Sequence, residues 1–333
     1  MSIRIGINGM GRIGRDYLRY ALDSSDLEVV AVNDLIDTAT IAQLLRFDST
    51  FGPLRHELEV AGNTLLAGDA KIAVSTARQP AELDWGAHGV QVVIEATGKF
   101  RTGESAGLHR GRGASRVLIS APGKAVDATI VMGVNDQTFR PDKHFVISNA
   151  SCTTNCLAPM VKVLHEAFGI ERGYLTTVHA YTNDQNVLDG PHSHPRRARA
   201  AAVNIIPTTT GAARAIGEVL PELAGRLDGV ALRVPVVDGS LVDLAVLLER
   251  DVTAEAVNDA FRTAAETGSL AGLLRYTEQP MVSSDVIYDN SSCVFDAGLT
   301  QASGRFAKVF GWYDNEWGYT CRLADLTRLV AAG

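Results

Sequence analysis

A glycine-rich stretch near the N-terminus constrains the fold of this chain more than any other feature. Gly9-Met10-Gly11-Arg12-Ile13-Gly14 has the pattern G-x-G-x-x-G, and it lies between an apolar run, Ile3–Ile7, and an amphipathic stretch, Ile13–Asp23. Glycines at this spacing allow a tight turn, close approach of the backbone to a pyrophosphate, and close packing of a helix on a strand. The N-terminus of that helix offers free N–H groups to phosphates. The pattern predicts a dinucleotide site at Gly9, Gly11 and Gly14, although glycine turns of this kind also occur without a nucleotide.

The next strand strengthens this prediction. Val29–Asn33 is apolar and ends in Asp34, about 20 residues after the last glycine, which is the spacing of the acid that binds a ribose 2′-hydroxyl. A carboxylate at this point repels a 2′-phosphate, and the following Leu35 and Ile36 supply no compensating arginine. NAD is therefore favoured over NADP. The alternative is that Asp34 is an ordinary turn residue at a strand end.

The first half of the chain alternates strand-like and helix-like patterns. Val90-Gln91-Val92-Val93-Ile94 is a nearly continuous rather than alternating apolar run, which is typical of a strand buried on both faces of a parallel sheet. Alternation of this kind predicts an α/β, doubly wound Rossmann domain. The predicted strands are Ile3–Ile7, Val29–Asn33, Lys71–Ser75, Val90–Glu95, Arg116–Ser120 and Phe145–Ser148, and the predicted helices include Ile13–Asp23 and Thr38–Phe47.

The pattern changes after about residue 150. A helix is predicted over Cys152–Phe168, and Pro159 within it predicts a kink or a missing backbone hydrogen bond. The segment Ala180–Ala202 has no clear period and is followed by strand-like and helical stretches. This mixture predicts a second, α+β domain with a largely antiparallel sheet. Its predicted elements are strands at Gly229–Pro235 and Leu241–Glu249 and a helix at Thr253–Thr267.

Composition excludes several classes of partner. The formal net charge is −7 with lysine and arginine scattered along the chain, whereas nucleic-acid binders present a basic face. No apolar run approaches the roughly 20 residues that span a bilayer, so neither nucleic acid nor membrane is an expected partner and we expect a cytoplasmic protein. The four cysteines form no Cys-x-x-Cys pair, and no histidine cluster has zinc spacing, so no metal is expected.

One of the four cysteines is a candidate nucleophile. Ser148–Cys156 is rich in small polar residues and opens the predicted helix, which places Cys152 at a helix N-terminus. The helix dipole favours a thiolate there, although most cysteines are small buried side chains. Cys156 lies one turn further into the same helix and is interpreted as structural.

His179 is the best-placed partner for that thiol. It follows the apolar run Tyr174–Val178 at the end of a predicted strand, and a cysteine nucleophile needs a nearby base or imidazolium. The other histidines are predicted to lie on exposed segments or, like His165, late in a helix. A lone histidine is usually a packing residue, so the functional interpretation of His179 depends on Cys152.

Taken together, these motifs resemble the glyceraldehyde-3-phosphate dehydrogenase family from one end of the chain to the other. The similar stretches are Gly6–Arg15, Ser148–Cys156, Thr177–Thr182, Ile206–Ala213 and Trp312–Glu316. The resemblance implies an NAD-dependent phosphorylating aldehyde dehydrogenase in which Cys152 attacks glyceraldehyde 3-phosphate and His179 accepts the hydroxyl proton. Hydride transfer then leaves a thioester, and inorganic phosphate releases 1,3-bisphosphoglycerate.

The resemblance also implies binding residues, domain limits and an oligomer. The substrate phosphate would be held by Thr182 and Arg233. The attacking phosphate would be held by Ser151, Thr153, Thr210, Gly211 and one arginine of the Arg196-Arg197 pair, with Arg197 preferred. The cofactor would be held by Gly9, Gly11, Arg12, Ile13, Gly14, Asp34, Arg78, Ser120 and Asn315. Residues 1–151 would form the NAD-binding domain, with a C-terminal helix at 315–333 packing back onto it, and residues 152–314 the catalytic domain. The loop Ala180–Ala202 would pack against a neighbouring subunit of a homotetramer.

One stretch departs from the family pattern, and other functions stay open. Pro235–Ser240 lacks a threonine of the usual pattern and has Asp238 where asparagine is usual, which is either neutral drift at a turn or a change beside the substrate-phosphate pocket. This departure also suggests an inhibitor-insensitive isozyme. Erythrose-4-phosphate dehydrogenase, which releases a free acid, is disfavoured by the intact Thr208–Gly211 segment. A catalytically silent NAD-binding scaffold is disfavoured by Cys152 and His179.

Overall fold

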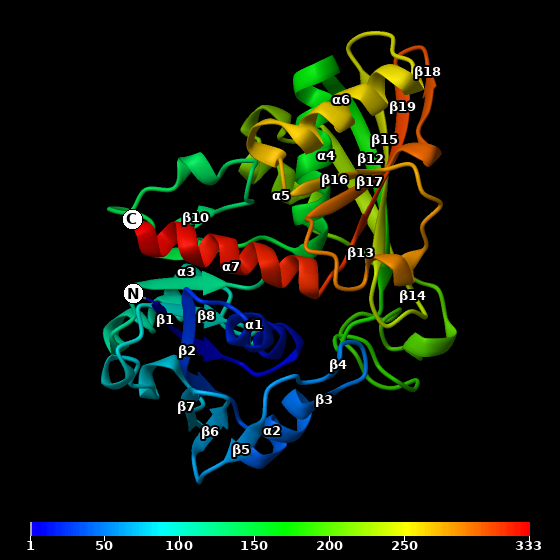
Figure 1. The fold of residues 1–333 in the computed structure, drawn as a ribbon. Helices are drawn as coiled ribbons and strands as arrows, with labels where there is room; N and C mark the ends of the chain where they lie inside the picture. The colour runs from blue at the N-terminus through cyan, green and yellow to red at the C-terminus, as the bar shows by residue number, and fades with distance from the viewer. Residues whose placement is uncertain (1) are drawn as a thin grey trace. The chain divides into compact units, whose positions relative to one another are not determined.

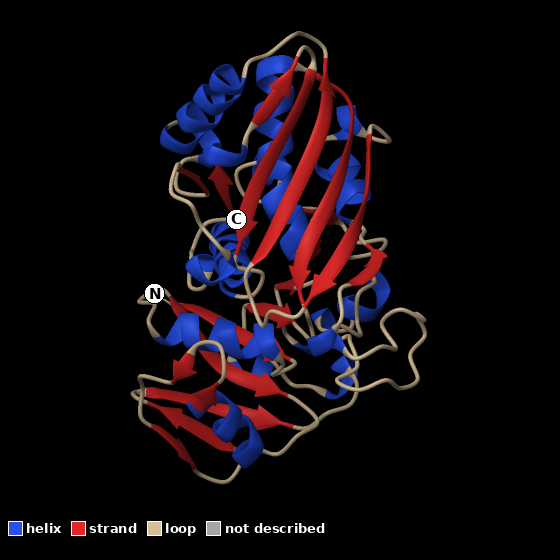
Figure 2. Cartoon of the chain, turned by 90° about the vertical axis from the view of Figure 1, so that its right-hand side faces the viewer, coloured by secondary structure: helices blue, strands red, loops and turns tan. Residues whose placement is uncertain are grey.

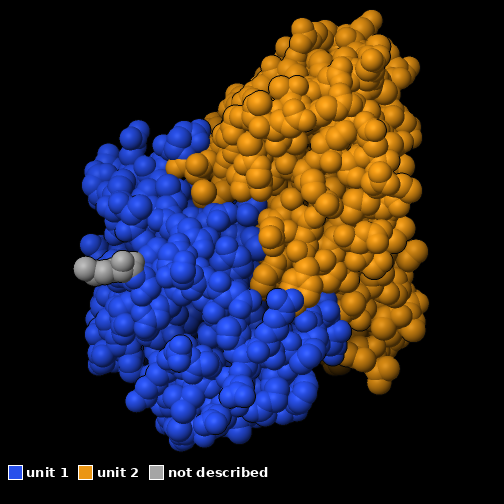
Figure 3. All heavy atoms as spheres, in the orientation of Figure 1, with its two compact units in different colours: residues 1–130, 137–150, 320–333 blue, residues 131–136, 151–319 orange. Residues whose placement is uncertain are grey.

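The computed structural model describes residues 2–333, which divide into two compact units. Unit 1 runs to Ile130 and includes residues 137–150 and 320–333; unit 2 contains Val131–Asp136 and Ser151–Tyr319 (Figure 3). Each unit is built around its own sheet. Short 3-10 helices lie at Pro80–Glu82, Gly86–His88, Arg110–Arg112, Asp136–Thr138, Ala201–Val203, Pro221–Leu223, Gly268–Leu270, Ser283–Val286 and Ala297–Leu299.

Unit 1 is a doubly wound α/β domain. Within residues 2–333 its sheet has the strand order β10-β11-β9-β8-β1-β2-β7-β6-β5, and all neighbours pair in parallel except β7 with β6 and β6 with β5, which are antiparallel. The strands are β1 (Ile3–Asn8), β2 (Leu27–Asn33), β5 (Leu58–Val60), β6 (Thr64–Ala67), β7 (Ala70–Ser75), β8 (Val92–Glu95), β9 (Arg116–Ile119), β10 (Ala128–Thr129) and β11 (Val146–Ser148). Helices α1 (Arg12–Leu22), α2 (Thr38–Arg46) and α3 (Gly103–Gly107) connect them, and β3 (Phe47–Asp48) pairs with β4 (Gly52–Pro53). The strands predicted from apolar runs are confirmed.

The central strands are buried on both faces, as their continuous apolar sequences predicted. Val92, Val93 and Ile94 of β8 are each at most 1% exposed. Burying an apolar side chain of this size contributes about 1.5–3 kcal/mol relative to leaving it in water. The sheet therefore holds its strand ends, where the glycine loop lies, on a rigid base.

The glycine loop between β1 and α1 requires glycine at two positions. Gly9 has a φ of 101°, a conformation that residues with a Cβ rarely adopt. A Cβ on Gly14 would collide with the carbonyl oxygen of Gly9, whereas a Cβ on Gly11 would meet nothing within 4 Å. Gly9 and Gly14 are therefore required by the fold itself, and the space beside Gly11 is left for a ligand.

We expect Gly14→Ala and Gly11→Ala to fail in different ways. Gly14→Ala forces the helix away from the Gly9 carbonyl, and overpacking of this kind costs about 1–3 kcal/mol of unfolding free energy. Gly11→Ala leaves that free energy nearly unchanged but weakens NAD binding at least about tenfold, since its methyl group occupies space that a pyrophosphate needs. Urea unfolding and NAD titration test both. Equal stability losses in the two variants would contradict this assignment.

The C-terminal helix, α7 (Trp317–Ala332), belongs to unit 1 from Thr320 onward. It packs on α1 and the start of β2. Tyr17 Oη donates to Thr327 Oγ1 at 2.8 Å, and Arg328 donates to both carboxylate oxygens of Asp26 at 2.7 and 3.0 Å. These contacts join the two ends of the chain within unit 1.

Unit 2 is an α+β domain with a largely antiparallel sheet. Within the described residues the strand order is β13-β14-β12-β15-β19-β17-β16, with β18 added beside β19; only β12–β14 and β16–β17 pair in parallel. The strands are β12 (Ile170–Ala180), β13 (Ile206–Thr209), β14 (Leu227–Val234), β15 (Ser240–Leu248), β16 (Leu274–Thr277), β17 (Cys293–Asp296), β18 (Gln301–Ser303) and β19 (Phe306–Tyr313). The helices are α4 (Cys152–Phe168), α5 (Ala212–Val219) and α6 (Ala254–Glu266), and α4 continues through Pro159.

Helices cover one face of this sheet and leave the other open. Helices α4, α5 and α6 lie against one face (Figure 1), and the broad opposite face of the strands is turned to the viewer in Figure 2. The open face carries exposed apolar side chains, including Tyr174, Val230 and Phe306. Helix α4 begins next to the end of strand β12. This arrangement brings Cys152, in the first turn of α4, into contact with His179 of β12.

Candidate active site

Unit 1 has a pocket at the carboxyl ends of its parallel strands. Parallel α/β sheets bind ligands at this edge, where helix N-termini and strand ends meet. The pocket is lined by Asn8, Gly9, Gly11, Asn33, Asp34, Leu35, Ala77, Arg78, Ala96, Thr97, Lys99 and Phe100. It therefore brings four of the predicted cofactor residues together: Gly9, Gly11, Asp34 and Arg78.

The remaining predicted cofactor residues of unit 1 lie beside this lining. Arg12 and Ile13 form the first turn of α1, and the Arg12 guanidinium pairs with Asp48 and lies over the ring of Phe51. Ser120 follows β9, where its N–H donates to Glu95 O at 3.0 Å. The helix N-terminus, rather than the Arg12 side chain, is the part that this structure leaves for a phosphate.

Asp34 fixes the glycine loop as well as facing the pocket. Its Oδ2 accepts from Met10 N at 2.7 Å, and its Oδ1 accepts from Leu35 N at 2.6 Å. Oδ1 also accepts from Ile36 N at 3.3 Å, so Oδ2 is the oxygen that keeps a lone pair for a ribose hydroxyl. Because the glycine turn, the open space at Gly11 and this carboxylate occur together, the residues fit a dinucleotide such as NAD.

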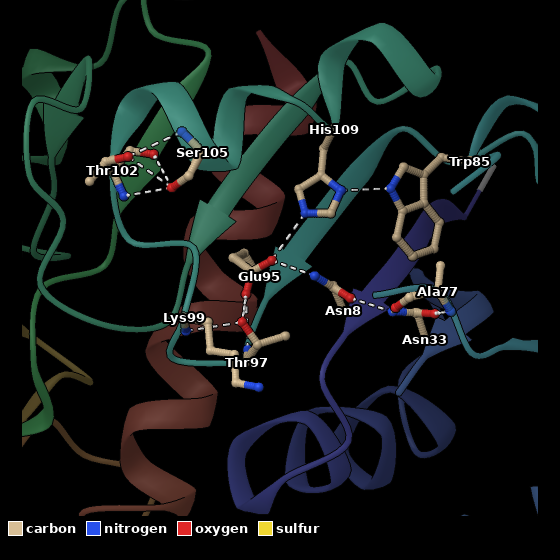
Figure 4. A network of polar contacts seen from close by, with 10 residues as sticks. All are labelled: Asn8, Asn33, Ala77, Trp85, Glu95, Thr97, Lys99, Thr102, Ser105 and His109. Atoms are coloured by element: carbon tan, nitrogen blue, oxygen red, sulfur yellow. Dashed lines mark hydrogen bonds and ion pairs between the residues drawn. The ribbon is translucent and has the colours of Figure 1, made fainter. Parts of the chain in front are cut away.

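A buried polar network lies beneath this pocket (Figure 4). Trp85 Nε1 donates to His109 Nδ1 at 2.9 Å, so the other ring nitrogen carries the proton and donates to Glu95 Oε2 at 3.0 Å. His109 is fully buried. The prediction that histidines other than His179 lie on exposed segments or late in a helix is wrong for His109. Its short polar helical segment gave no sign of the Trp85 and Glu95 partners that bury it.

Glu95 connects this network to the walls of the pocket. Its carboxylate also accepts from Asn8 Nδ2 at 2.6 Å and from Thr97 N at 3.0 Å. Asn33 Nδ2 donates in turn to Asn8 Oδ1 at 2.8 Å, and its Oδ1 accepts from Ala77 N at 2.8 Å. The strand ends that carry the pocket residues are thus held by one continuous set of hydrogen bonds, which the sequence analysis missed because its members are spread over a hundred residues.

In unit 2, the first turn of α4 presents Cys152. Ser151 caps the helix by accepting from Thr154 N at 3.0 Å, and the preceding Ala150 has a φ of 55°, a left-handed conformation that is costly for alanine. The chain therefore turns sharply just before the helix begins. Cys152 is the first helical residue, and Cys156, one turn on, is fully buried.

His179 meets Cys152 from the end of β12. The Cys152 Sγ lies 3.4 Å from His179 Nε2, and His179 Nδ1 lies 2.7 Å from Ala180 O. Arg233 Nη1 is 3.0 Å from the same carbonyl and 2.8 Å from Nδ1. In the tautomer with the proton on Nδ1, this proton is donated to Ala180 O, which can also accept from Nη1–H, and Nε2 accepts the thiol proton.

Burial and charge act in opposite directions on the Cys152–His179 pair. Burial raises the pKa of Cys152, while the Arg233 guanidinium and the Thr153 backbone N–H lower it. Burial, with Arg233, lowers the pKa of His179. Burial thus favours the neutral thiol and imidazole, against the stabilisation of the thiolate by the helix N-terminus. Moving one proton from Sγ to Nε2 converts the neutral pair to the reactive one.

Tyr313, at the end of β19, connects α4 with β12; no role was predicted for it. Its Oη is 2.9 Å from both Thr153 Oγ1 and Thr177 Oγ1, and its ring lies edge-on to His179 with centroids 5.9 Å apart. The Thr153 hydroxyl is thus buried against Tyr313, so its backbone N–H is the group left for a ligand. Tyr313 lies in Trp312–Glu316, a quoted motif, but no spacing rule links it to Cys152.

Two arginines lie near His179. The Arg233 side chain is half-buried, and its Nε has no hydrogen-bond partner among the described residues. Arg197 pairs with Asp184, and its Nε donates to Thr208 Oγ1 at 3.0 Å; its charge also acts on His179. Two guanidinium groups beside one reactive pair are suited to binding anions.

The other predicted anion-binding residues all belong to unit 2. Thr182 N lies 3.3 Å from Gln185 Oε1 just after β12, and Thr210 Oγ1 accepts from Ala212 N at 3.2 Å. Gly211 is the N-cap of α5 and has nothing within 4 Å of an added Cβ. Ser151 is occupied as the cap of α4.

Comparisons with known proteins show the family to which the chain belongs. Residues 3–103 match the family described as glyceraldehyde 3-phosphate dehydrogenase, NAD binding domain, and residues 151–315 match the C-terminal domain of the same enzyme. The chain belongs to the glyceraldehyde-3-phosphate dehydrogenase family. The two matched ranges contain, respectively, the glycine loop with Asp34 and the Cys152–His179 pair.

Relatives of this family cover the chain from end to end. Proteins named glyceraldehyde-3-phosphate dehydrogenase are 57% identical over 332 residues in Streptomyces coelicolor and 54% identical over 333 residues in Geobacillus stearothermophilus. One from Mycobacterium avium is 52% identical over 337 aligned residues. Each alignment covers at least 99% of both chains. Among residues 2–333, no helix has the length and apolar character needed to cross a membrane.

Proposed function

We propose that this chain oxidises D-glyceraldehyde 3-phosphate with NAD and inorganic phosphate to 1,3-bisphosphoglycerate, through a thioester on Cys152. The family membership supports the reaction, and the 3.4 Å contact between Cys152 Sγ and His179 Nε2 supports the assignment of nucleophile and base. A thioester conserves the free energy of aldehyde oxidation, so a phosphate can take up the acyl group in the next step.

The chemistry proceeds in three steps at Cys152. The thiol proton passes to His179 Nε2 as Sγ bonds to the aldehyde carbon, and the imidazolium returns that proton to the carbonyl oxygen, which gives the hemithioacetal hydroxyl and restores the neutral imidazole. NAD supplies the hydride acceptor. As hydride leaves the carbon, His179 removes the hydroxyl proton, which leaves the thioester. Inorganic phosphate then attacks the acyl carbon, the C–S bond breaks, and the acyl phosphate departs.

Two anion sites follow from the arginines near this pair. Arg233, with a buried and unpartnered Nε, would hold the substrate phosphate together with Thr182. Arg197 would hold the attacking phosphate with Ser151, the Thr153 N–H, Thr210 and Gly211. Arg197 is paired with Asp184 in this structure, so a bound phosphate competes with that carboxylate for the guanidinium group.

The residues proposed to bind NAD come from both matched ranges, except Ser120, which lies between them. Gly9, Gly11 and the first turn of α1, including Arg12, Ile13 and Gly14, would receive the pyrophosphate, and Asp34 the adenine ribose. Arg78, Ser120 and Asn315 complete the proposed set, with Asn315 holding the nicotinamide carboxamide. We propose residues 1–151 with the helix at 315–333 as the nucleotide domain and 152–314 as the catalytic domain.

Asp34→Asn tests the assignment of cofactor preference. The amide keeps an oxygen for Met10 N but removes the charge that repels a 2′-phosphate. We expect kcat/KM with NADP to rise about tenfold, while that with NAD falls, because a hydrogen bond to a charged group is worth about 1.5–3 kcal/mol. Asp37→Asn, at the N-cap of α2, is the matched control. An unchanged NADP:NAD ratio in Asp34→Asn would refute the assignment.

We also propose that four copies assemble into a homotetramer. The open face of the unit 2 sheet carries exposed Tyr174, Val230 and Phe306, and the loop after β12 carries Val187 and Leu188, which are 80% and 77% exposed. Exposed apolar patches of this kind mark interfaces. Sedimentation velocity is expected to give a particle of four times the subunit mass. A monomer at micromolar concentration would contradict the proposed tetramer.

A cytoplasmic location is proposed on the chemistry of Cys152. A nucleophilic thiol must stay reduced, and the cytoplasm maintains thiols in that state. None of the four cysteines, all of which lie within residues 2–333, forms a disulfide bond.

Phosphate dependence tests the proposed function. NADH formation from glyceraldehyde 3-phosphate is expected to need inorganic phosphate or arsenate for multiple turnovers. A steady rate that ignores phosphate, with erythrose 4-phosphate as the better substrate, would favour a hydrolytic relative instead. NAD binding without any turnover would favour a scaffold role.

A further inference from the structure

Asp238 occupies an unusual position for a carboxylic acid. It lies in the turn between β14 and β15, is 2% exposed, and accepts from its neighbour Gly239 N through Oδ1 at 2.8 Å. Its other oxygen, Oδ2, is also buried and has no donor among the described residues. As a carboxylate, Asp238 would therefore leave a buried acceptor unpaired, which is unfavourable.

The neighbouring acid, Asp314, is in the opposite situation. It is 1% exposed, and it accepts from Tyr288 N at 2.8 Å, Glu316 N at 2.8 Å and Trp317 N at 2.6 Å. Three backbone donors stabilise a negative charge, so Asp314 is the ionised member of the pair.

A single proton shared between Asp238 and Asp314 gives the buried Oδ2 of Asp238 a hydrogen-bond partner. The Asp238 and Asp314 side chains are within hydrogen-bond reach of each other, and two carboxylates in contact cannot both be ionised at low cost. With the proton on Asp238, Oδ2–H donates to Asp314, and the orphaned acceptor becomes a paired donor. Burial, with the charges of Asp314 and Glu316, raises the pKa of Asp238 to about 9.

The turn that carries Asp238 is joined directly to the proposed nicotinamide residue. Ser240, two residues on, donates from Oγ to Asn315 Oδ1 at 2.6 Å and accepts from Ala180 N at 3.1 Å. Gly239 between them has a φ of 84°, and a Cβ there would collide with Ser283 O. The turn is therefore tightly confined and is fixed to residues 314–315 at two points.

We propose that Asp238, in its protonated form, is a positioning residue for NAD: its hydrogen bond to Asp314 holds the turn 238–240 against residues 314–315 and so orients the Asn315 amide for the nicotinamide carboxamide. This inference rests on the proposed role of Asn315. It also explains the departure at Asp238: the structure places the carboxyl group in an acid pair, where an asparagine amide would make the same donation without titrating.

Ionisation of Asp238 would act on several neighbouring groups. On the facing segment it would place a second negative charge beside Asp314 and Glu316, which are the nearest charged groups acting on it. On α4 its charge would oppose ionisation of the Cys152 thiol. The 283–286 segment contributes Asp285, whose carboxylate accepts from Val282 N at 2.8 Å. These groups are all acidic, so none of them compensates the new charge. We therefore predict that high pH breaks the hydrogen bond between Asp238 and Asp314.

The test compares NAD binding by the full-length enzyme from pH 7.5 to 10 with that by Asp238→Asn. For the wild type we expect the dissociation constant for NAD to rise about tenfold by pH 10, one decade per pH unit above the pKa. The corresponding change in Asp238→Asn is expected to stay within about twofold. An infrared C=O stretch of a protonated carboxyl group, present in the wild type at pH 7.5 and absent from Asp238→Asn, is the second readout. Parallel binding profiles, or no such band, would overturn the proposal.

Asn315→Ala separates failure of this inference from failure of the proposed cofactor site. If Asn315→Ala binds NAD as tightly as the wild type, the role of Asn315 is wrong and the positioning role falls with it. If Asn315→Ala binds weakly but wild type and Asp238→Asn share one pH profile, only the role of Asp238 is wrong. Thermal unfolding checks that each variant folds. Because the pKa of Asp238 is raised in the folded state, its contribution to wild-type stability is present at low pH and lost as the pH rises through about 9.

Discussion

Replacing Cys152 with alanine is expected to lower the rate of NADH formation from glyceraldehyde 3-phosphate by about 10⁴-fold or more. Without Sγ no hemithioacetal forms, and removing a catalytic nucleophile typically costs at least this factor. The side chain is small and lies in the first turn of α4, so the fold and NAD binding should persist. Steady-state NADH absorbance, with NAD titration as the check on binding, measures the effect.

Cys156→Ala is the matched control, because it removes the same atom one helical turn away. Cys156 is fully buried, and its Sγ donates to Gly311 O at 3.5 Å. We expect a stability loss of about 1 kcal/mol from the small cavity and turnover within a few-fold of the wild type. Activity that survives in Cys152→Ala, or that disappears equally in both variants, would contradict the assignment of Cys152 as nucleophile.

His179→Asn is expected to lower kcat by about 10³-fold, within the range for loss of a general base. The amide fills part of the imidazole space but cannot accept and return the protons of the thiol and hemithioacetal. Alkylation of Cys152 by iodoacetamide should also slow, since only the thiolate reacts and Nε2 is its proton acceptor. Stopped-flow NADH formation and the alkylation rate are the two measurements.

A histidine outside the site provides the control for this variant. His88 is exposed and lies in unit 1, so His88→Asn should match the wild type in both measurements. If His179→Asn lost turnover but alkylated at the wild-type rate, His179 would act only on the later hemithioacetal step. Wild-type turnover in His179→Asn would remove it from the mechanism.

The sequence predicted unit 1 well because its signals are local. The run Val90–Ile94 is apolar except for Gln91, which is typical of a strand covered on both faces, and β8 lies there with Glu95 at its end. The glycine pattern and Asp34 are likewise set by short-range geometry and by strand order in a parallel sheet. Gly9, Gly11 and Asp34 line one pocket, as expected.

Unit 2 was harder to predict because its strands are one-sided and their partners are distant. β19 has alternating burial and pairs with β15, which lies about sixty residues earlier, so neither its pattern nor its neighbours are visible in a short window. Tyr313, at its end, was missed as the link between Thr153 and Thr177 for the same reason.

Buried polar residues were the other gap. His109 and Asp238 belong to types that are mostly exposed, and only their partners, Glu95 and Asp314, explain why burial is tolerated. Those partners lie 14 and 76 positions away in the chain. The family resemblance marked Asp238 as a departure, but its chemistry follows only from the acid pair.

The most direct test of the central claim is to trap the thioester. The enzyme would be mixed with glyceraldehyde 3-phosphate and NAD without phosphate, quenched in acid, digested, and analysed by mass spectrometry. We predict one 3-phosphoglyceroyl group on the peptide that contains Cys152, and its loss when phosphate is added before the quench. NADH formation with no acyl group on that peptide, or with the group on another residue, would contradict the mechanism.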